Sequence, residues 1–234
     1  MHLYNGPQYH KNYRQMHLET TSGGGASLLG CIPIGGLWTS VEQNLHINVK
    51  EMLAILYAIR SFLDKIQGQH IRILCDNTTA VSVINKMGST RSDICNSMAK
   101  DIWDFCREND IFITCSYIPG KENVVADQAS RKEYKQGEWM LNKSLFQKAV
   151  QHFDFQPDID CFATRINSQL PTYVSRYPDP FATQVDAFSF NWSKYKPYLF
   201  PPFSQVPDNS VCRPPLILLP CWEKSIEKLS IRER

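Results

Sequence analysis

Apolar residues recur with two different periods in the first half of the chain, and these periods predict a mixture of strands and helices. Residues 48–66 carry apolar side chains at i, i+3, i+4 and i+7, the pattern of one packed amphipathic helix. Before residue 41, short mixed runs are separated by Gly23-Gly24-Gly25 and by Gly35-Gly36, which predicts three short strands joined by hairpin turns.

Beyond residue 70 the pattern alternates between strands and helices. The expected elements are a strand over 71–75, a helix over 77–87 that Gly88 stops, a helix over 93–108, a strand over 111–118 and a short helix over 122–131. Hairpins that give way to strand–helix–strand units predict an α/β fold, with a mixed sheet and helices on both of its faces.

Composition divides the chain into a first domain over 15–132 and a less regular remainder. A charged, glycine-ended stretch makes 133–137 a predicted linker. Residues 138–220 hold many aromatic residues and prolines with little periodicity, and we expect a smaller α/β-like segment there, followed by a tail over 221–234.

Length and composition exclude several classes of protein. A chain of 234 residues with 43% apolar residues can bury a core in one or two domains. Its N-terminus is polar, and no run approaches the roughly 18 apolar residues of a membrane span. We therefore expect a soluble intracellular protein of the cytoplasm or nucleus, with no membrane partner. The net charge of +2 permits a nucleic-acid partner without indicating one.

The eight cysteines are expected to be buried free thiols, because several fall inside apolar runs. No Cys-x-x-Cys pair occurs, and no histidine lies at zinc-ligand spacing from a cysteine. Any metal would therefore be held by oxygen.

Three acidic residues from separate elements are expected to meet in the fold: Glu51 in the first turn of the long helix, Asp76 at the end of a strand, and Asp127 in the short helix. Ligands collect at the carboxyl ends of sheet strands, where Asp76 lies. Such a cluster can bind two Mg²⁺ ions about 4 Å apart for phosphodiester hydrolysis.

Each acid also has an ordinary structural interpretation. Asn48-x-x-Glu51 fits a capping box, in which Glu51 only returns a hydrogen bond to the helix N-terminus. Asp76 could cap the helix that follows it, and Asp127 could pair with Arg131 on one helix face.

The words around these acids carry a resemblance. HINVKEMLAI, ILCDNTTAVSVINKMG and YIPGKENVVADQASR are similar to the second, third and fourth acidic motifs of type I ribonuclease H, in the form that follows reverse transcriptase in retroelement polyproteins, closest to the DIRS-like retrotransposons. The similarity runs from about His17 to Arg131. It implies a five-stranded ribonuclease H-like sheet, two Mg²⁺ ions held by Glu51, Asp76 and Asp127, and cleavage of the RNA strand of RNA/DNA hybrids.

The first acid of that family is missing. The family carries an aspartate on its first strand, whereas this chain reads HLETTSGGGASLLG, and its first aspartate anywhere is Asp64. Glu19 is the nearby carboxylate, and its extra methylene displaces the oxygens from a two-metal geometry. We expect an impaired nuclease; the alternative is a catalytically inactive nucleic-acid-binding module of a decayed retrotransposon.

Four polar residues are candidates for contact with nucleic acid: Asn77, Arg91, Lys121 and Asn123. Their alternative interpretation is ordinary solvated loop polarity. No histidine lies between His70 and His152, although many ribonucleases H carry one before the last acid.

The segment from Pro157 to Val206 resembles the region that follows the nuclease in DIRS-like polyproteins, and more faintly the adenine-N6 DNA methyltransferases. Those enzymes end a strand with Asp/Asn-Pro-Pro-Tyr/Phe, and the polar residue accepts a hydrogen bond from the flipped base. Here Phe200 stands at that position, and no glycine-rich cofactor loop is present. We expect a structural remnant rather than a working methyltransferase.

Overall fold

The structure is a computed structural model of the chain. It describes residues 14–20, 23–28, 31, 33–124, 126 and 140–201. The chain divides into two compact units, Met1–Tyr134 and Lys135–Arg234. The predicted linker over 133–137 and the predicted tail over 221–234 lie outside the described residues.

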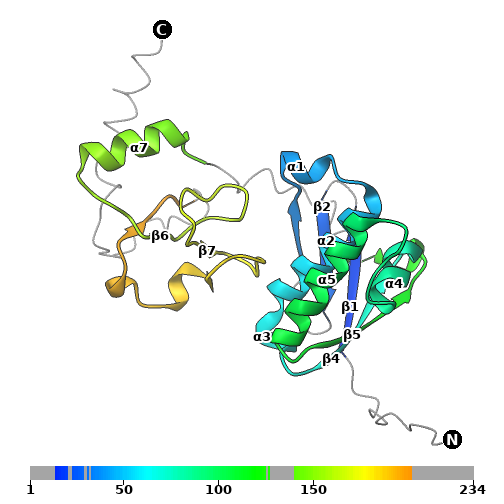
Figure 1. The fold of residues 1–234 in the computed structure, drawn as a ribbon. Helices are drawn as coiled ribbons and strands as arrows, with labels where there is room; N and C mark the ends of the chain where they lie inside the picture. The colour runs from blue at the N-terminus through cyan, green and yellow to red at the C-terminus, as the bar shows by residue number, and fades with distance from the viewer. Residues whose placement is uncertain are drawn as a thin grey trace, which may run out of the picture. The chain divides into compact units, whose positions relative to one another are not determined.

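The first unit is built on a five-stranded mixed sheet, with strand order β3-β2-β1-β4-β5. Neighbouring strands run antiparallel from β3 to β1, whereas β1, β4 and β5 run parallel to one another (Figure 1). Alternate residues of β4 are fully buried, as expected for a central strand with packed neighbours. The strands are β1 (Arg14–Thr20), β2 (Gly23–Leu28), β3 (Ile34–Leu37), β4 (His70–Cys75) and β5 (Phe112–Tyr117).

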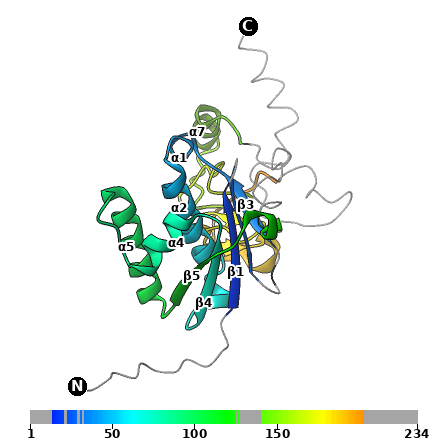
Figure 2. The same ribbon diagram turned by 90° about the vertical axis from the view of Figure 1, so that its right-hand side faces the viewer.

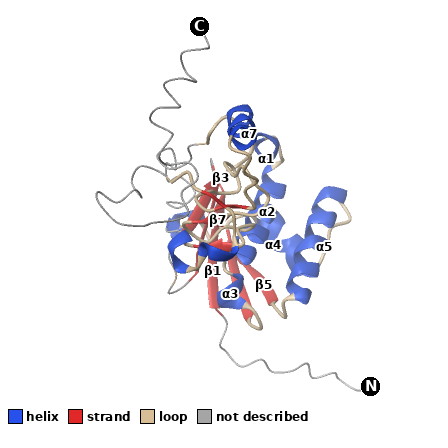
Figure 3. Ribbon diagram, turned by 90° about the vertical axis from the view of Figure 1, so that its left-hand side faces the viewer, coloured by secondary structure: helices blue, strands red, loops and turns tan. Residues whose placement is uncertain are grey.

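Three helices pack against this sheet: α2 (Ile47–Ser61), α4 (Thr78–Asn85) and α5 (Asp93–Glu108). They contact one another as well as the strands, and Figures 2 and 3 show them on the same side of the sheet. A mixed α/β architecture is thus confirmed. The helix predicted over 122–131 lies mostly outside the described residues. Helix packing on the second face of the sheet therefore stays a prediction.

The long helix expected over 48–66 is interrupted. α2 ends at Ser61, Phe62 leaves the helical conformation with φ −101° and ψ 14°, and a separate turn, α3 (Leu63–Ile66), follows. Phe62, at the break, and Ile66, in the turn that follows it, are both buried. The prediction of a single helix was wrong, because the apolar spacing continues through the break and gives no sign of it.

A shared type of turn ends α4, α5 and α7 (Lys143–His152), the long helix of the second unit. In each turn the residue after the C-cap has a positive φ, and the next N–H donates to a carbonyl five residues back, as in a Schellman motif. The positive-φ residues are Met87 (56°), Asp110 (55°) and Asp154 (45°). The predicted stop at Gly88 is therefore displaced by one residue, since Met87 takes the left-handed conformation that glycine usually supplies.

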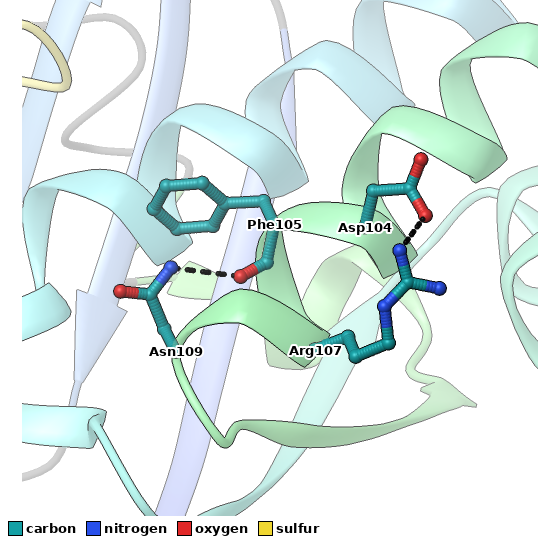
Figure 4. Close-up of polar contacts among 4 residues, drawn as sticks. All are labelled: Asp104, Phe105, Arg107 and Asn109. Atoms are coloured by element: carbon teal, nitrogen blue, oxygen red, sulfur yellow. Dashed lines mark hydrogen bonds and ion pairs between the residues drawn. The ribbon is translucent and has the colours of Figure 1, made fainter.

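Side chains also hold the C-terminal end of α5 (Figure 4). Arg107 Nη2 lies 2.9 Å from Asp104 Oδ1, and Asn109 Nδ2 donates to the Phe105 carbonyl at 2.8 Å. The Arg60 guanidinium of α2 lies over the Phe105 ring, 4.8 Å from its centroid. The contact between Arg60 and Phe105 links the two longest helices of the first unit.

The outer edge of β5 is met by one amide side chain. Asn85 Nδ2 donates to the Cys115 carbonyl at 2.8 Å, and Asn85 Oδ1 accepts from the Cys115 N–H at 2.9 Å. Both outward-facing backbone groups of Cys115 are thereby paired.

Residues 140–201 of the second unit form α7, two parallel strand pairs and two 3-10 turns. The strands are β6 (Ile159–Asp160), β7 (Val174–Ser175), β8 (Gln184–Val185) and β9 (Pro197–Tyr198), and the turns are η2 (Ala187–Ser189) and η3 (Trp192–Lys194). β6 pairs with β9 and β7 pairs with β8. Its core is small and consists of Ile159, Cys161, Val174, Ala187 and Leu199.

The described cysteines carry free thiols, as predicted; Cys31 is partly exposed and the other five are buried. Within the part of the chain that the structure describes, we find no helix with the length and apolar character of a membrane span.

Candidate metal centre

Glu51 enters the centre from the first turns of α2. That helix is capped by His46, whose Nδ1 accepts from the Asn48 N–H at 3.2 Å, so the capping box considered for Asn48 and Glu51 is wrong. The Glu51 side chain is 3% exposed, and its Oε2 lies 3.6 Å from the Cys75 thiol. Glu51 therefore faces the carboxyl end of β4 instead of its own helix terminus.

Asp76 directly follows β4 and does not cap the next helix. Asn77 performs that role, with its Oδ1 accepting from the Ala80 N–H at 2.9 Å. A Cβ at Gly120 would lie 3.5 Å from Asp76 Oδ2, so the Pro119–Gly120 turn passes directly beside this carboxylate. Asp76 is thus placed by the strand end and is left available for a ligand.

Ligand atoms of Glu51, Cys75 and Asp76 all lie within 4.8 Å of one another. Sequence reasoning missed Cys75, although its position next to Asp76 was a usable signal. Burial, and then the charge of Glu51, raise the pKa of the Cys75 thiol far above its usual range. The thiol is therefore protonated and acts as a hydrogen-bond donor to Glu51.

Position 19 belongs to the same end of the sheet. β1 pairs in parallel with β4, and the register places His17 opposite Leu74. If this register continued for two more residues along both segments, position 19 would lie opposite position 76. The side chain of Glu19 and the whole of Asp127 lie outside what the structure describes. Of the three predicted carboxylates, the structure brings Glu51 and Asp76 together.

The predicted nucleic-acid contacts differ in exposure. Arg91 and Lys121 are exposed, and Asn77 is partly exposed, with its Nδ2 donating to Asn48 Oδ1 at 3.0 Å. Asn123 is buried, with 1% of its surface exposed, at the end of the short 3-10 turn η1 (Gly120–Glu122).

Fold and site together define a mixed α/β domain with an acidic centre at the carboxyl end of a central strand. Residues 34–99 match the family model of the RNase H-like domain found in reverse transcriptase. This match, which includes Glu51 and Asp76, supports an RNase H-like domain in the first unit.

The comparisons with curated proteins and with solved structures are less informative. No curated protein matches the chain. Among solved structures, RNase H1 from the halophilic archaeon Halobacterium salinarum NRC-1 is similar to it, with a TM-score of 0.39 and 12% sequence identity over 50% of this chain and 97% of that chain.

The donor set fits a hard divalent cation. Carboxylate oxygens are the ligands that Mg²⁺ prefers, and the two acids come from different elements but lie within bridging distance. A protonated thiol beside them adds no competing negative charge.

Proposed function

We propose that the first unit is a Mg²⁺-dependent ribonuclease H-type domain of a DIRS-like retroelement polyprotein, and that it hydrolyses the RNA strand of RNA/DNA hybrids at a reduced rate. The observation that carries this proposal is the convergence of Glu51 and Asp76 from α2 and β4. Capping does not account for either acid, because His46 and Asn77 cap the helices.

The residues of the first unit would have the following roles. Glu51, Asp76 and Asp127 would hold Mg²⁺, which supplies an activated water and stabilises the leaving oxygen. Arg91 and Lys121 would bind phosphates, because both are exposed cations. Hybrid would be recognised by its minor-groove shape and its 2′-hydroxyls.

Cleavage of a labelled RNA/DNA hybrid with Mg²⁺ tests the proposal. We expect Asp76→Asn and Glu51→Gln each to lower the rate by roughly a hundredfold or more, because each removes a charged ligand from a site with few. Asp101→Asn, an exposed aspartate of α5, is the matched control and should keep the wild-type rate. Cleavage that persists unchanged in Asp76→Asn would reject the proposed site.

A second candidate function is a non-catalytic module that binds nucleic acid. The absence of any aspartate before Asp64 favours it, because one metal ligand of the family is then missing. It requires hybrid affinity that falls with rising salt and is unchanged when Mg²⁺ is removed, with no cleavage by the wild-type chain.

For the second unit we propose a structural remnant of a methyltransferase-like fold without cofactor binding. The parallel pairing of β6 with β9 supports the likeness, because it puts Asp160 opposite Tyr198, two residues before Phe200. Phe200 still offers no acceptor for a base amino group. Calorimetry with S-adenosylmethionine should show no binding; a measurable binding heat would overturn this part.

A further inference from the structure

A segment of the second unit combines exposed aromatic rings with positive charge. Residues 186–196, here called the aromatic loop, read DAFSFNWSKYK. The loop contains four aromatic residues and two lysines, with a single acid at its start. Interleaved aromatic and basic residues are typical of surfaces that bind single-stranded nucleic acid.

Not all of these rings fill the core. Phe190 and Trp192 are partly buried and pack against the small core of the unit. Phe188 is 56% exposed, and Tyr195 is exposed as well. Phe188 keeps contact with its neighbours, since its ring centroid lies 5.7 Å from that of Phe162 and 6.1 Å from that of Trp192. The cluster therefore presents a supported ring to solvent.

The loop is held in one conformation by local hydrogen bonds. Asp186 Oδ1 accepts from the Phe188 N–H at 3.0 Å, and Asn191 Oδ1 accepts from the Ser193 N–H at 2.9 Å. The indole N–H of Trp192 donates to the Ala187 carbonyl at 2.5 Å. A rigid loop loses less conformational entropy on binding than a mobile one.

The loop presents two lysine cations to a polyanion. Lys194 and Lys196 are exposed, and neither forms an ion pair within residues 140–201. The nearby carboxylates of Asp158 and Asp186 already accept backbone N–H groups, from Lys196 at 2.8 Å and from Phe188 at 3.0 Å.

A further cation and ring adjoin the start of the loop. β7 pairs with β8 so that Ser175 lies opposite Val185. One residue further along, Arg176 falls opposite Asp186. The Arg176 guanidinium lies over the exposed Tyr177 ring, 5.4 Å from its centroid.

We propose that the aromatic loop, with Arg176 and Tyr177 beside it, binds single-stranded nucleic acid. Unpaired bases stack on Phe188, and the cations of Lys194, Lys196 and Arg176 pair with the phosphates. This surface is separate from the metal centre and does not rest on the proposed nuclease activity. A duplex or hybrid engages it weakly because its bases are already stacked.

Fluorescence anisotropy of labelled single-stranded DNA and RNA oligonucleotides with the full chain tests this proposal. Phe188→Ala should weaken binding about fivefold to a hundredfold, the range for loss of one stacked base. Phe153→Ala, which removes another exposed ring of the same unit, is the matched control and should bind as wild type. Lys194→Gln with Lys196→Gln should lower the salt slope by about 0.7 per lysine.

Three further measurements distinguish a loss of base stacking from other causes of weaker binding. An abasic oligonucleotide should bind wild type as weakly as a normal one binds Phe188→Ala. Hybrid cleavage by Phe188→Ala should stay at the wild-type rate. Equal losses in Phe188→Ala and Phe153→Ala, or no single-strand binding by wild type, would overturn the proposal, and such a result would leave the nuclease proposal standing.

Discussion

Position 19 is the candidate for the family's missing first acid. The parallel register of β1 and β4, if continued, would carry this position to the level of Asp76, and the sequence supplies glutamate there. Glutamate is longer than aspartate by one methylene, and displacement of about 1 Å in a catalytic site can cost a hundredfold in rate.

Shortening that side chain should therefore restore activity. We expect Glu19→Asp to raise the rate of Mg²⁺-dependent hybrid cleavage by about tenfold or more, measured beside wild type under the same conditions. Glu19→Gln keeps the length but removes the charge, and it should be no faster than wild type. If Glu19→Asp and wild type cleave at the same rate, position 19 does not supply a ligand.

Asp160 makes the stability of the second unit depend on pH. Burial raises the pKa of this carboxyl to about 6, although the Gln169 and Phe162 N–H groups act in the opposite direction. A carboxyl with a raised pKa in the folded state favours folding at low pH. Stability should therefore fall by about 3 kcal/mol as pH rises from about 4 to about 6, and change little through this group above that range.

Urea unfolding across this pH range measures the effect. Asp160→Asn cannot ionise, so its unfolding free energy should lose most of this slope. Asp158→Asn alters an exposed neighbour and should retain the slope. A wild-type curve that rises with pH through the same range would contradict the assignment.

At the scale of elements, the shared helix endings differ in strain. Asp110 and Asp154 tolerate a positive φ because aspartate visits the left-handed region more readily than most residues. Methionine has no such preference, so the positive φ of Met87 strains the backbone. Met87 is 60% exposed, so its side chain contributes little packing to offset this strain.

Met87→Gly should therefore stabilise the first unit by about 1 kcal/mol, because glycine relieves the backbone strain of one left-handed residue. Thermal unfolding gives the measurement. Met87→Ala removes the same side chain but keeps the Cβ, and it should bring no comparable gain. Equal stability of the two variants would mean that side-chain exposure, not backbone strain, is what matters at this position.

Sequence reasoning predicted which helices and strands form better than it predicted where they end and what they contact. Periodicity located the strands and helices of the first unit because each buries one face, whereas the break at Phe62 leaves the apolar spacing intact. The capping roles of His46 and Asn77 depend on which residue leaves helical geometry, and sequence spacing does not determine that. Cys75 joined the site through its contact with Glu51 of α2, a tertiary contact that sequence spacing does not show.

Among the described residues, the largest hydrophobic cluster of each unit is separate from that of the other. The large cluster includes Ile55, Ile73 and Ile102 and draws its described members from the first unit, whereas the small cluster around Ile159 belongs to the second. Two cores without shared members predict two unfolding events.

Ile159→Ala removes a fully buried side chain and should destabilise the second unit by about 2–5 kcal/mol. Hydrogen exchange should show the loss in β6 and β9, with β4 and β5 unchanged. Ile73→Ala is the reciprocal variant and should loosen β4 and β5 alone. Loss of protection in both units from either variant would show that they fold as one.

Asn85 also affects the exposed edge of the sheet at β5. A strand edge with unpaired backbone groups invites another chain to continue the sheet, which is a common route to aggregation. By occupying both outward groups of Cys115 from the side, the amide of Asn85 stands where an incoming strand would have to bond. Asn85 thus blocks strand pairing at Cys115, and it does so with an uncharged side chain.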